Sequence, residues 1–85
     1  MVDPDEFVAT ITKIFREQLD DEKLAVGMET RQSDLGGWDS LAHIRIVMGV
    51  EREYGVQLDV EEIESIKSVR GFLDAVNAHG GSDRR

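Results

Sequence analysis

Apolar residues recur every three or four positions from Phe7 to Leu19, and most positions between them are polar. This spacing predicts a helix with one buried face. Asp3 can cap the helix, with Pro4 at the first helical position and Glu6 three residues after the cap. We therefore expect a helix over about residues 4–19.

Helical spacing is lost between Asp20 and Asp39, where Gly27, Gly36 and Gly37 lie among polar residues. Clusters of glycine and small polar residues indicate a loop. Loops of roughly 20 residues are uncommon inside small domains unless they serve a function. We expect an ordered loop that four apolar residues hold against the core: Leu24, Val26, Met28 and Leu35.

A second helical pattern follows this loop and ends near Gly55, where glycine can supply a left-handed C-terminal residue. Gly49, inside this helix, indicates close packing against a neighbouring backbone. We expect Met48, together with Phe72 of the last helix, to lie in the core. The apolar positions of the second helix are Leu41, Ile44, Val47, Met48 and Val50.

Two shorter helices complete the pattern. Asp59 and Glu62 form a capping pair before the first of them, whose apolar residues are Val60, Ile63 and Ile66. Ser68 can cap the last helix, in which one face carries Val69, Phe72, Leu73 and Val76. The expected fold class is all-α: a four-helix bundle with three longer helices, a short third helix, and a long loop between the first two. Residues 1–79 would form the domain, and residues 80–85 a disordered polar tail.

Composition and charge exclude several functions. Ten Lys and Arg residues against 18 Asp and Glu residues give a net charge of −8, which disfavours binding to nucleic acid and to anionic membranes. The chain has no Cys, and His43 and His79 are too far apart for a zinc pattern, so no metal site is expected. No signal peptide or membrane span is apparent. We expect a cytoplasmic monomer, too small for a self-contained enzyme.

The candidate chemistry lies where the loop meets the second helix. There Asp39 and Ser40 bring a carboxylate and a hydroxyl to a helix start, whose free N–H groups and positive dipole end favour a phosphate. Asp39 or Ser40 could equally serve only as the helix cap, because both residue types are preferred at that position. The residue types alone leave both interpretations open.

The stretch Gly37–Leu41 resembles the Gly-x-Asp-Ser-Leu attachment motif of the acyl carrier protein family, and the similarity covers essentially residues 4–78. The resemblance implies that a phosphopantetheinyl transferase, using magnesium and coenzyme A, attaches 4'-phosphopantetheine to Ser40. It also implies that Asp39 helps to dock the serine and the magnesium, and that Leu41 seats against the transferase or the core. The chain would then be a non-catalytic carrier of acyl thioesters.

The same resemblance places a partner face on the second helix and the loop before it. We expect this face to include Trp38, Ala42, Arg45, Glu51 and Arg52. Ala42 and Arg45 stand where carriers of fatty acid synthesis are usually acidic. This difference favours polyketide or other specialised biosynthesis, with acyl-loading and acyl-transfer or condensing enzymes as partners. A lone loop aromatic such as Trp38 more often anchors its loop by burial.

Two alternatives stay open. Leu35, Gly36 and Gly37 resemble the Leu-Gly-Gly run of aminoacyl and peptidyl carriers, although the Asp39–Ser40 pair favours the acyl branch. The chain could also be a helical interaction module that carries no prosthetic group. Self-contained hydrolysis is not expected, because a serine hydrolase also needs an orienting acid and an oxyanion hole. His43, one turn after Ser40, is interpreted as a surface neighbour only.

Overall fold

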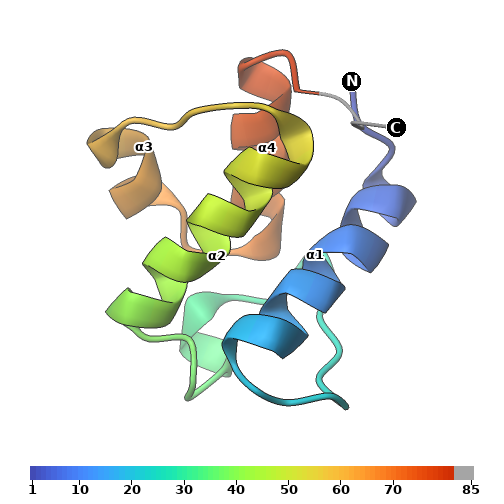
Figure 1. Cartoon of the computed structure of the whole chain (residues 1–85), viewed down its shortest axis with the longest axis vertical. Coiled ribbons are helices and arrows are strands. Elements are labelled where there is room, and N and C mark those ends of the chain that lie inside the picture. Colours follow the sequence, from blue (N-terminus) through green and yellow to red (C-terminus); the bar gives the residue numbers. More distant parts are fainter. Residues whose placement is uncertain (82–85) are drawn as a thin grey trace.

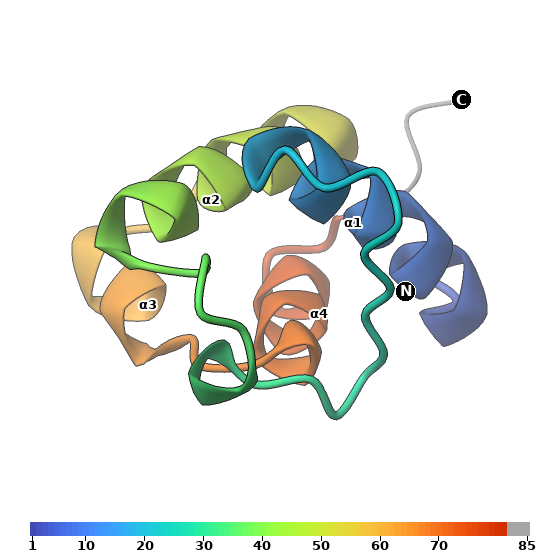
Figure 2. The same cartoon turned by 90° about the horizontal axis from the view of Figure 1, so that it is seen from below.

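The computed structural model describes residues 1–81, and these form an all-α fold, as expected (Figure 1). Its helices are α1 (Pro4–Gln18), α2 (Ser40–Tyr54), α3 (Val60–Ser65) and α4 (Val69–Ala78). α1 packs against both α2 and α4, and it runs antiparallel to α2. α3 lies on the far side of α2 from α1 in Figure 1, and it lies beside the first turns of α2, away from α1, in Figure 2. The short third helix thus borders α2 without facing α1.

The helix boundaries follow from capping residues that the sequence identifies. The side chains of Asp3, Asp59 and Ser68 each accept a hydrogen bond from the backbone N–H three residues later. Gly55 ends α2 in the left-handed conformation, with φ of 67°. Each of these predictions is confirmed. At the three N-terminal caps, side-chain oxygens satisfy N–H groups that have no partner inside the helix.

The core is built from one face of each long helix. Phe7, Ile11 and Phe15 follow one another at intervals of four along α1, and all three are fully buried. Trp38 joins them from the loop, with its ring packed edge-on against Phe15 at 4.8 Å between centroids. The remaining fully buried side chains come from α2 and α4: Ile46, Val47, Val50, Val69, Phe72 and Val76.

The long loop is ordered and is fastened to the start of α4. The N–H of Gln32 donates to the carbonyl of Lys67 at 2.8 Å, and the N–H of Val69 donates to the carbonyl of Thr30 at 3.0 Å. A short 3₁₀ helix, Gln32–Asp34, follows this contact. The four apolar residues expected to hold the loop do pack against the core. The loop is therefore a fixed part of the domain.

Four residues that the sequence places in the apolar patterns of the second and third helices are exposed: Leu41, Ile44, Met48 and Val60. Met48 is 52% exposed, so its assignment to the core is wrong, whereas Phe72 is buried as expected. Val60 of α3 also faces solvent. The buried face of α2 consists of Ala42, His43, Ile46, Val47, Val50 and Tyr54, and Met48 falls outside that arc. The sequence-based stripe had combined residues from two faces of the helix.

Both ends of the described part of the chain are tied to α4. Gly80 has φ of 70°, and the buried Gly81 donates its N–H to the carbonyl of Val76 at 2.8 Å, as in a Schellman motif. Both glycines are thus ordered, although the sequence assigned them to the disordered tail. Residues 82–85, the rest of that predicted tail, lie outside the described residues. At the other terminus, the N–H of the buried Val2 donates to Oδ1 of Asn77 at 3.0 Å.

Gly49 allows α1 and α2 to approach closely. A Cβ atom built on Gly49 would lie 3.0 Å from Cγ2 of Ile14, which is tighter than an ordinary van der Waals contact. Close packing at Gly49 is confirmed, but the neighbour is the side chain of Ile14 and not a backbone. The absence of a side chain at position 49 therefore sets the spacing of this helix pair.

We expect Gly49→Val to lower the free energy of unfolding by about 1–3 kcal/mol through overpacking, even though valine has the higher helix propensity. In an Ile14→Ala background the same substitution should cost less, because the methyl group it meets is gone. Urea unfolding of the four proteins measures this coupling. Equal costs in the two backgrounds would contradict the role assigned to this contact.

Candidate functional site

Ser40 is the first residue of α2, and its side chain is exposed. Its hydroxyl makes no hydrogen bond to any other described residue. Asp39 precedes it as the N-cap, and Oδ1 of Asp39 accepts the N–H of Ala42 at 2.9 Å. The question of which residue caps α2 is thereby answered: Asp39 is the cap, and the Ser40 hydroxyl stays available.

The loop before Ser40 is held by the burial of Trp38. This residue is only 2% exposed, and its ring stacks on Phe72 of α4 at 6.1 Å between centroids. The side-chain amide of Gln32 donates to the Trp38 carbonyl at 3.0 Å. Trp38 therefore anchors the loop, and its assignment to the partner face is wrong because a buried ring offers no surface to a partner.

His43 connects the loop to α3. Nε1 of Trp38 donates to Nδ1 of His43 at 2.9 Å, and Nε2 of His43 lies 2.9 Å from the carbonyl oxygen of Ile63. The indole can only donate and the carbonyl can only accept, so these partners assign the ring hydrogen to Nε2. We call this chain of two hydrogen bonds, from Trp38 through His43 to Ile63, the indole–imidazole bridge.

The expectation that His43 is a surface neighbour of Ser40 is wrong, because its side chain is buried. Both ring nitrogens are used in the indole–imidazole bridge, so neither is directed at the Ser40 hydroxyl. A general base must lie within hydrogen-bond reach of the proton it removes. In this arrangement His43 therefore positions the elements around Ser40 and does not activate its hydroxyl.

A hollow of about 450 Å³ lies beside Ser40, between α2 and α3. Ile44 and Ile63 give it apolar walls, and Glu64 and Lys67 also line it. α3 begins with a capping box, in which Asp59 and Glu62 each bond the backbone N–H of the other. The Asp59 N–H, and then the His79 ring, keep the pKa of Glu62 below its ordinary value. Glu62 therefore caps α3 as a carboxylate, and α3 forms one wall of the hollow.

Comparison with known proteins identifies the family. Residues 9–76 match the family described as the phosphopantetheine attachment site, which is most of the chain. The chain belongs to this family. Its fold is also similar to the solution NMR structure of a holo acyl carrier protein from Geobacter metallireducens, with a TM-score of 0.74 and 29% sequence identity. The match covers 86% of this chain and 84% of that one.

The family match confirms the resemblance found in the Gly37–Leu41 stretch, and it makes covalent 4'-phosphopantetheine the prosthetic group of this carrier domain. Among residues 1–81, no three His, Asp or Glu side chains gather into a potential metal site. Within the same residues, none of the helices is both long enough and apolar enough to cross a bilayer.

The residues expected to form the partner face of the carrier domain differ in how exposed they are. Arg45 and Arg52 are exposed, as a partner face requires. Ala42 is only 6% exposed, so its assignment to that face is wrong. Glu51 is half-buried, and its Oε2 accepts the N–H of Leu58 at 2.8 Å. The Glu51 carboxylate therefore fastens the turn after α2, and only part of the side chain remains for a partner.

Sequence reasoning missed an exposed apolar surface next to Ser40. Leu41, Ile44 and Met48, which we call the apolar stripe, are 60%, 46% and 52% exposed. Leu41 thus faces solvent and does not seat in the core. The spacing of these residues, three and four positions apart, was visible in the sequence, but the pattern does not tell which face of an apolar helix is covered.

We expect His43→Ala to lower the free energy of unfolding by about 2 kcal/mol or more, because it leaves the indole N–H of Trp38 and the carbonyl of Ile63 without partners. The matched control is His79→Ala, which removes an exposed contact with Glu62 and should cost less than about 1 kcal/mol. Urea unfolding, followed by Trp38 fluorescence, measures both. Similar losses in the two variants would argue against the indole–imidazole bridge.

Proposed function

We propose that the protein is an acyl carrier whose 4'-phosphopantetheine arm is joined through a phosphodiester to Oγ of Ser40. The observation that carries this assignment is the exposed, unbonded hydroxyl at the first position of α2. It lies inside the residues that match the attachment family. The arm ends in a thiol, which holds acyl groups as thioesters.

The start of α2 suits a phosphodiester. The first N–H groups of a helix have no acceptor within it, and the dipole is positive there, which favours a phosphate by about 0.3–1 kcal/mol. Asp39 uses Oδ1 for the cap, whereas its Oδ2 bonds no other described residue. We assign Oδ2 to the magnesium ion that a phosphopantetheinyl transferase brings to the reaction.

The surroundings of Ser40 also suit the arm once it is attached. The hollow between α2 and α3 opens beside Ser40, and the side chains of Ile44 and Ile63 can contact the apolar part of the arm. Lys67 lines the same hollow and can contact the phosphate. The indole–imidazole bridge fixes the distance between the two helices, so the width of the hollow depends on the core.

We assign the carrier to polyketide or related specialised biosynthesis. The exposed charged residues of α2 are two arginines, Arg45 and Arg52, and neither forms an ion pair with a described residue. The apolar stripe adds an uncharged contact area next to Ser40. These features favour acyl-loading, acyl-transfer or condensing enzymes with neutral or acidic docking surfaces. Ala42 is buried, so the lack of an acidic side chain at this position does not change the surface that a partner meets.

Intact mass tests the attachment. After incubation with coenzyme A and a broad-specificity phosphopantetheinyl transferase, we expect the wild-type mass to rise by one phosphopantetheinyl group and the Ser40→Ala mass to stay unchanged. Ser33→Ala, which removes an exposed loop hydroxyl, is the matched control and should be modified like wild type. Ser40→Ala should keep its helical circular dichroism, because Asp39 provides the cap. An unmodified wild-type protein would favour an interaction module without an arm.

Acyl-transfer kinetics test the pathway. We expect Arg45→Glu to lower kcat/KM with polyketide-type loading enzymes by about fivefold or less, since an exposed charge contributes about 1 kcal/mol at most. The same substitution should improve use by fatty acid synthesis enzymes. Arg31→Glu, an exposed charge reversal in the loop, serves as the control. Unchanged rates with both enzyme sets would show that Arg45 does not determine which enzymes use the carrier.

A further inference from the structure

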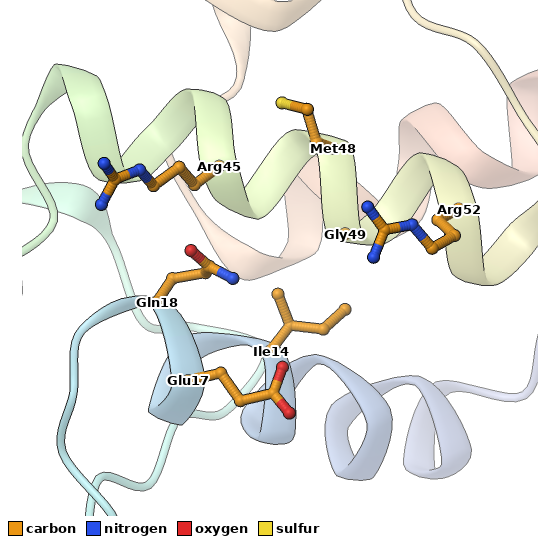
Figure 3. A pocket seen from close by; sticks show the side chains of 7 residues that line it. All are labelled: Ile14, Glu17, Gln18, Arg45, Met48, Gly49 and Arg52. Carbon is orange, nitrogen blue, oxygen red and sulfur yellow. The ribbon is translucent and has the colours of Figure 1, made fainter.

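A groove runs between α1 and α2 and adjoins the apolar stripe, whose Met48 lies at its edge (Figure 3). Its volume is about 260 Å³, and it is open to solvent. The floor is formed by Ile14, which packs closely against Gly49. Glu17 and Gln18 of α1 form one wall. Met48 borders the groove but points away from α1.

Two arginines of α2 flank this floor. Arg45 and Arg52 lie on either side of Gly49, and both side chains run along α2 beside the groove (Figure 3). They are seven residues apart, which is two helical turns or about 10 Å along the axis. Neither forms a salt bridge or a hydrogen bond with any described residue, although Glu17 lines the same groove.

Two of the three other arginines among residues 1–81 have partners. Nε of Arg16 donates to the carbonyl of Leu24 at 2.6 Å, and Arg70 pairs with Glu29. The protein has a net charge of −8, so two unpaired cations on one groove are a local reversal of sign. Guanidinium groups are weakly hydrated and bind carboxylates in a bidentate manner. The groove therefore offers two separate carboxylate positions.

We propose that this groove docks an acidic helical segment of a partner enzyme, with two carboxylates two turns apart and one apolar side chain between them. The carboxylates would pair with Arg45 and Arg52, and the apolar side chain would fill the space over Ile14 and Gly49. That space is larger than the engineered apolar cavity of about 150 Å³ that holds benzene. The inference rests on the proposed function in one respect: the partner is taken to be an enzyme that uses the arm.

The geometry favours a protein segment over a small anion. Two guanidinium groups carried on positions about 10 Å apart along one helix match separate carboxylates better than a single phosphate. Glu17 lies in the same groove and repels a compact polyanion, whereas a helical segment can place a donor opposite it. A helix with acidic residues at i and i+7 repeats the two-turn spacing of the arginine pair.

The position of the groove gives the contact a consequence for Ser40. Arg45 is five residues after Ser40 on the same helix, a separation of about 7.5 Å along the axis. A partner held at Arg45 and Arg52 would therefore be fixed in its rotation about α2. Leu41 and Ile44 of the apolar stripe do not line the groove, so they would remain free to contact the entrance of that partner's active site.

A peptide probe tests the docking directly. The probe is a synthetic helical peptide with two glutamates seven positions apart and a leucine midway, titrated into the ¹⁵N-labelled full chain. We expect amide shifts to concentrate at Ile14, Gln18, Arg45, Gly49 and Arg52. Arg45→Gln and Arg52→Gln should each weaken binding at least threefold, and the double variant at least tenfold. Arg31→Gln, at an exposed arginine outside the groove, should bind like wild type.

Two peptide controls separate spacing from net charge. A peptide with its glutamates three positions apart and one with glutamines in their place should both bind at least threefold more weakly than the probe. Dispersed shifts, equal loss with Arg31→Gln, or no detectable binding of the probe would overturn the proposal. Ser40→Ala should bind the probe normally, so a failed docking test is distinct from a failed attachment test by intact mass.

Discussion

The hydrogen bond from the Trp38 indole to the His43 ring holds the loop against the first turn of α2, and the site around Ser40 depends on it. Because the indole can only donate, the imidazole must accept at Nδ1 and donate from Nε2 to the carbonyl of Ile63. One buried side chain thus fixes the loop, α2 and α3 together. Ser40 can remain exposed and unbonded because its position is set by the residues beneath it.

α2 divides its surface among different tasks. Its buried arc builds the core and contains His43, its N-terminal end presents Ser40, and the apolar stripe faces solvent beside that serine. Next to this stripe, Arg45 and Arg52 border the groove between α1 and α2, whose floor is Ile14 against Gly49. A helix of 15 residues can present these sides at once because successive residues are rotated by about 100°. Because Arg45 follows Ser40 by only five residues, a partner held at the groove would lie close to the attachment site.

Local features of the fold were predictable from the sequence because they depend on residues close together in the chain. The caps at Asp3, Asp59 and Ser68 and the left-handed Gly55 each need only a few neighbouring residues. The Gly37–Leu41 motif indicated the family for the same reason. In this sense the helices, the ordered loop and the candidate attachment residue followed from sequence.

Properties that depend on distant partners were not predictable in the same way. The burial of His43 requires Trp38 on one side and Ile63 on the other, which come together only in the folded domain. Met48 and Val47 are both apolar, and only the positions of α1 and α4 decide that Val47 is covered and Met48 is not. Ala42 was placed on the outer face by resemblance, whereas the structure turns it inward.

The hydrogen bond from the N–H of Val2 to the side chain of Asn77 holds the N-terminal residues against the end of α4. α2 begins at the opposite end of the molecule, where the loop delivers Ser40 (Figure 1). A tether attached at the N-terminus would therefore leave from the pole opposite the serine. If the domain is immobilised or fused at that terminus, the arm would point away from the anchor and could swing between enzymes without the linker crossing its path.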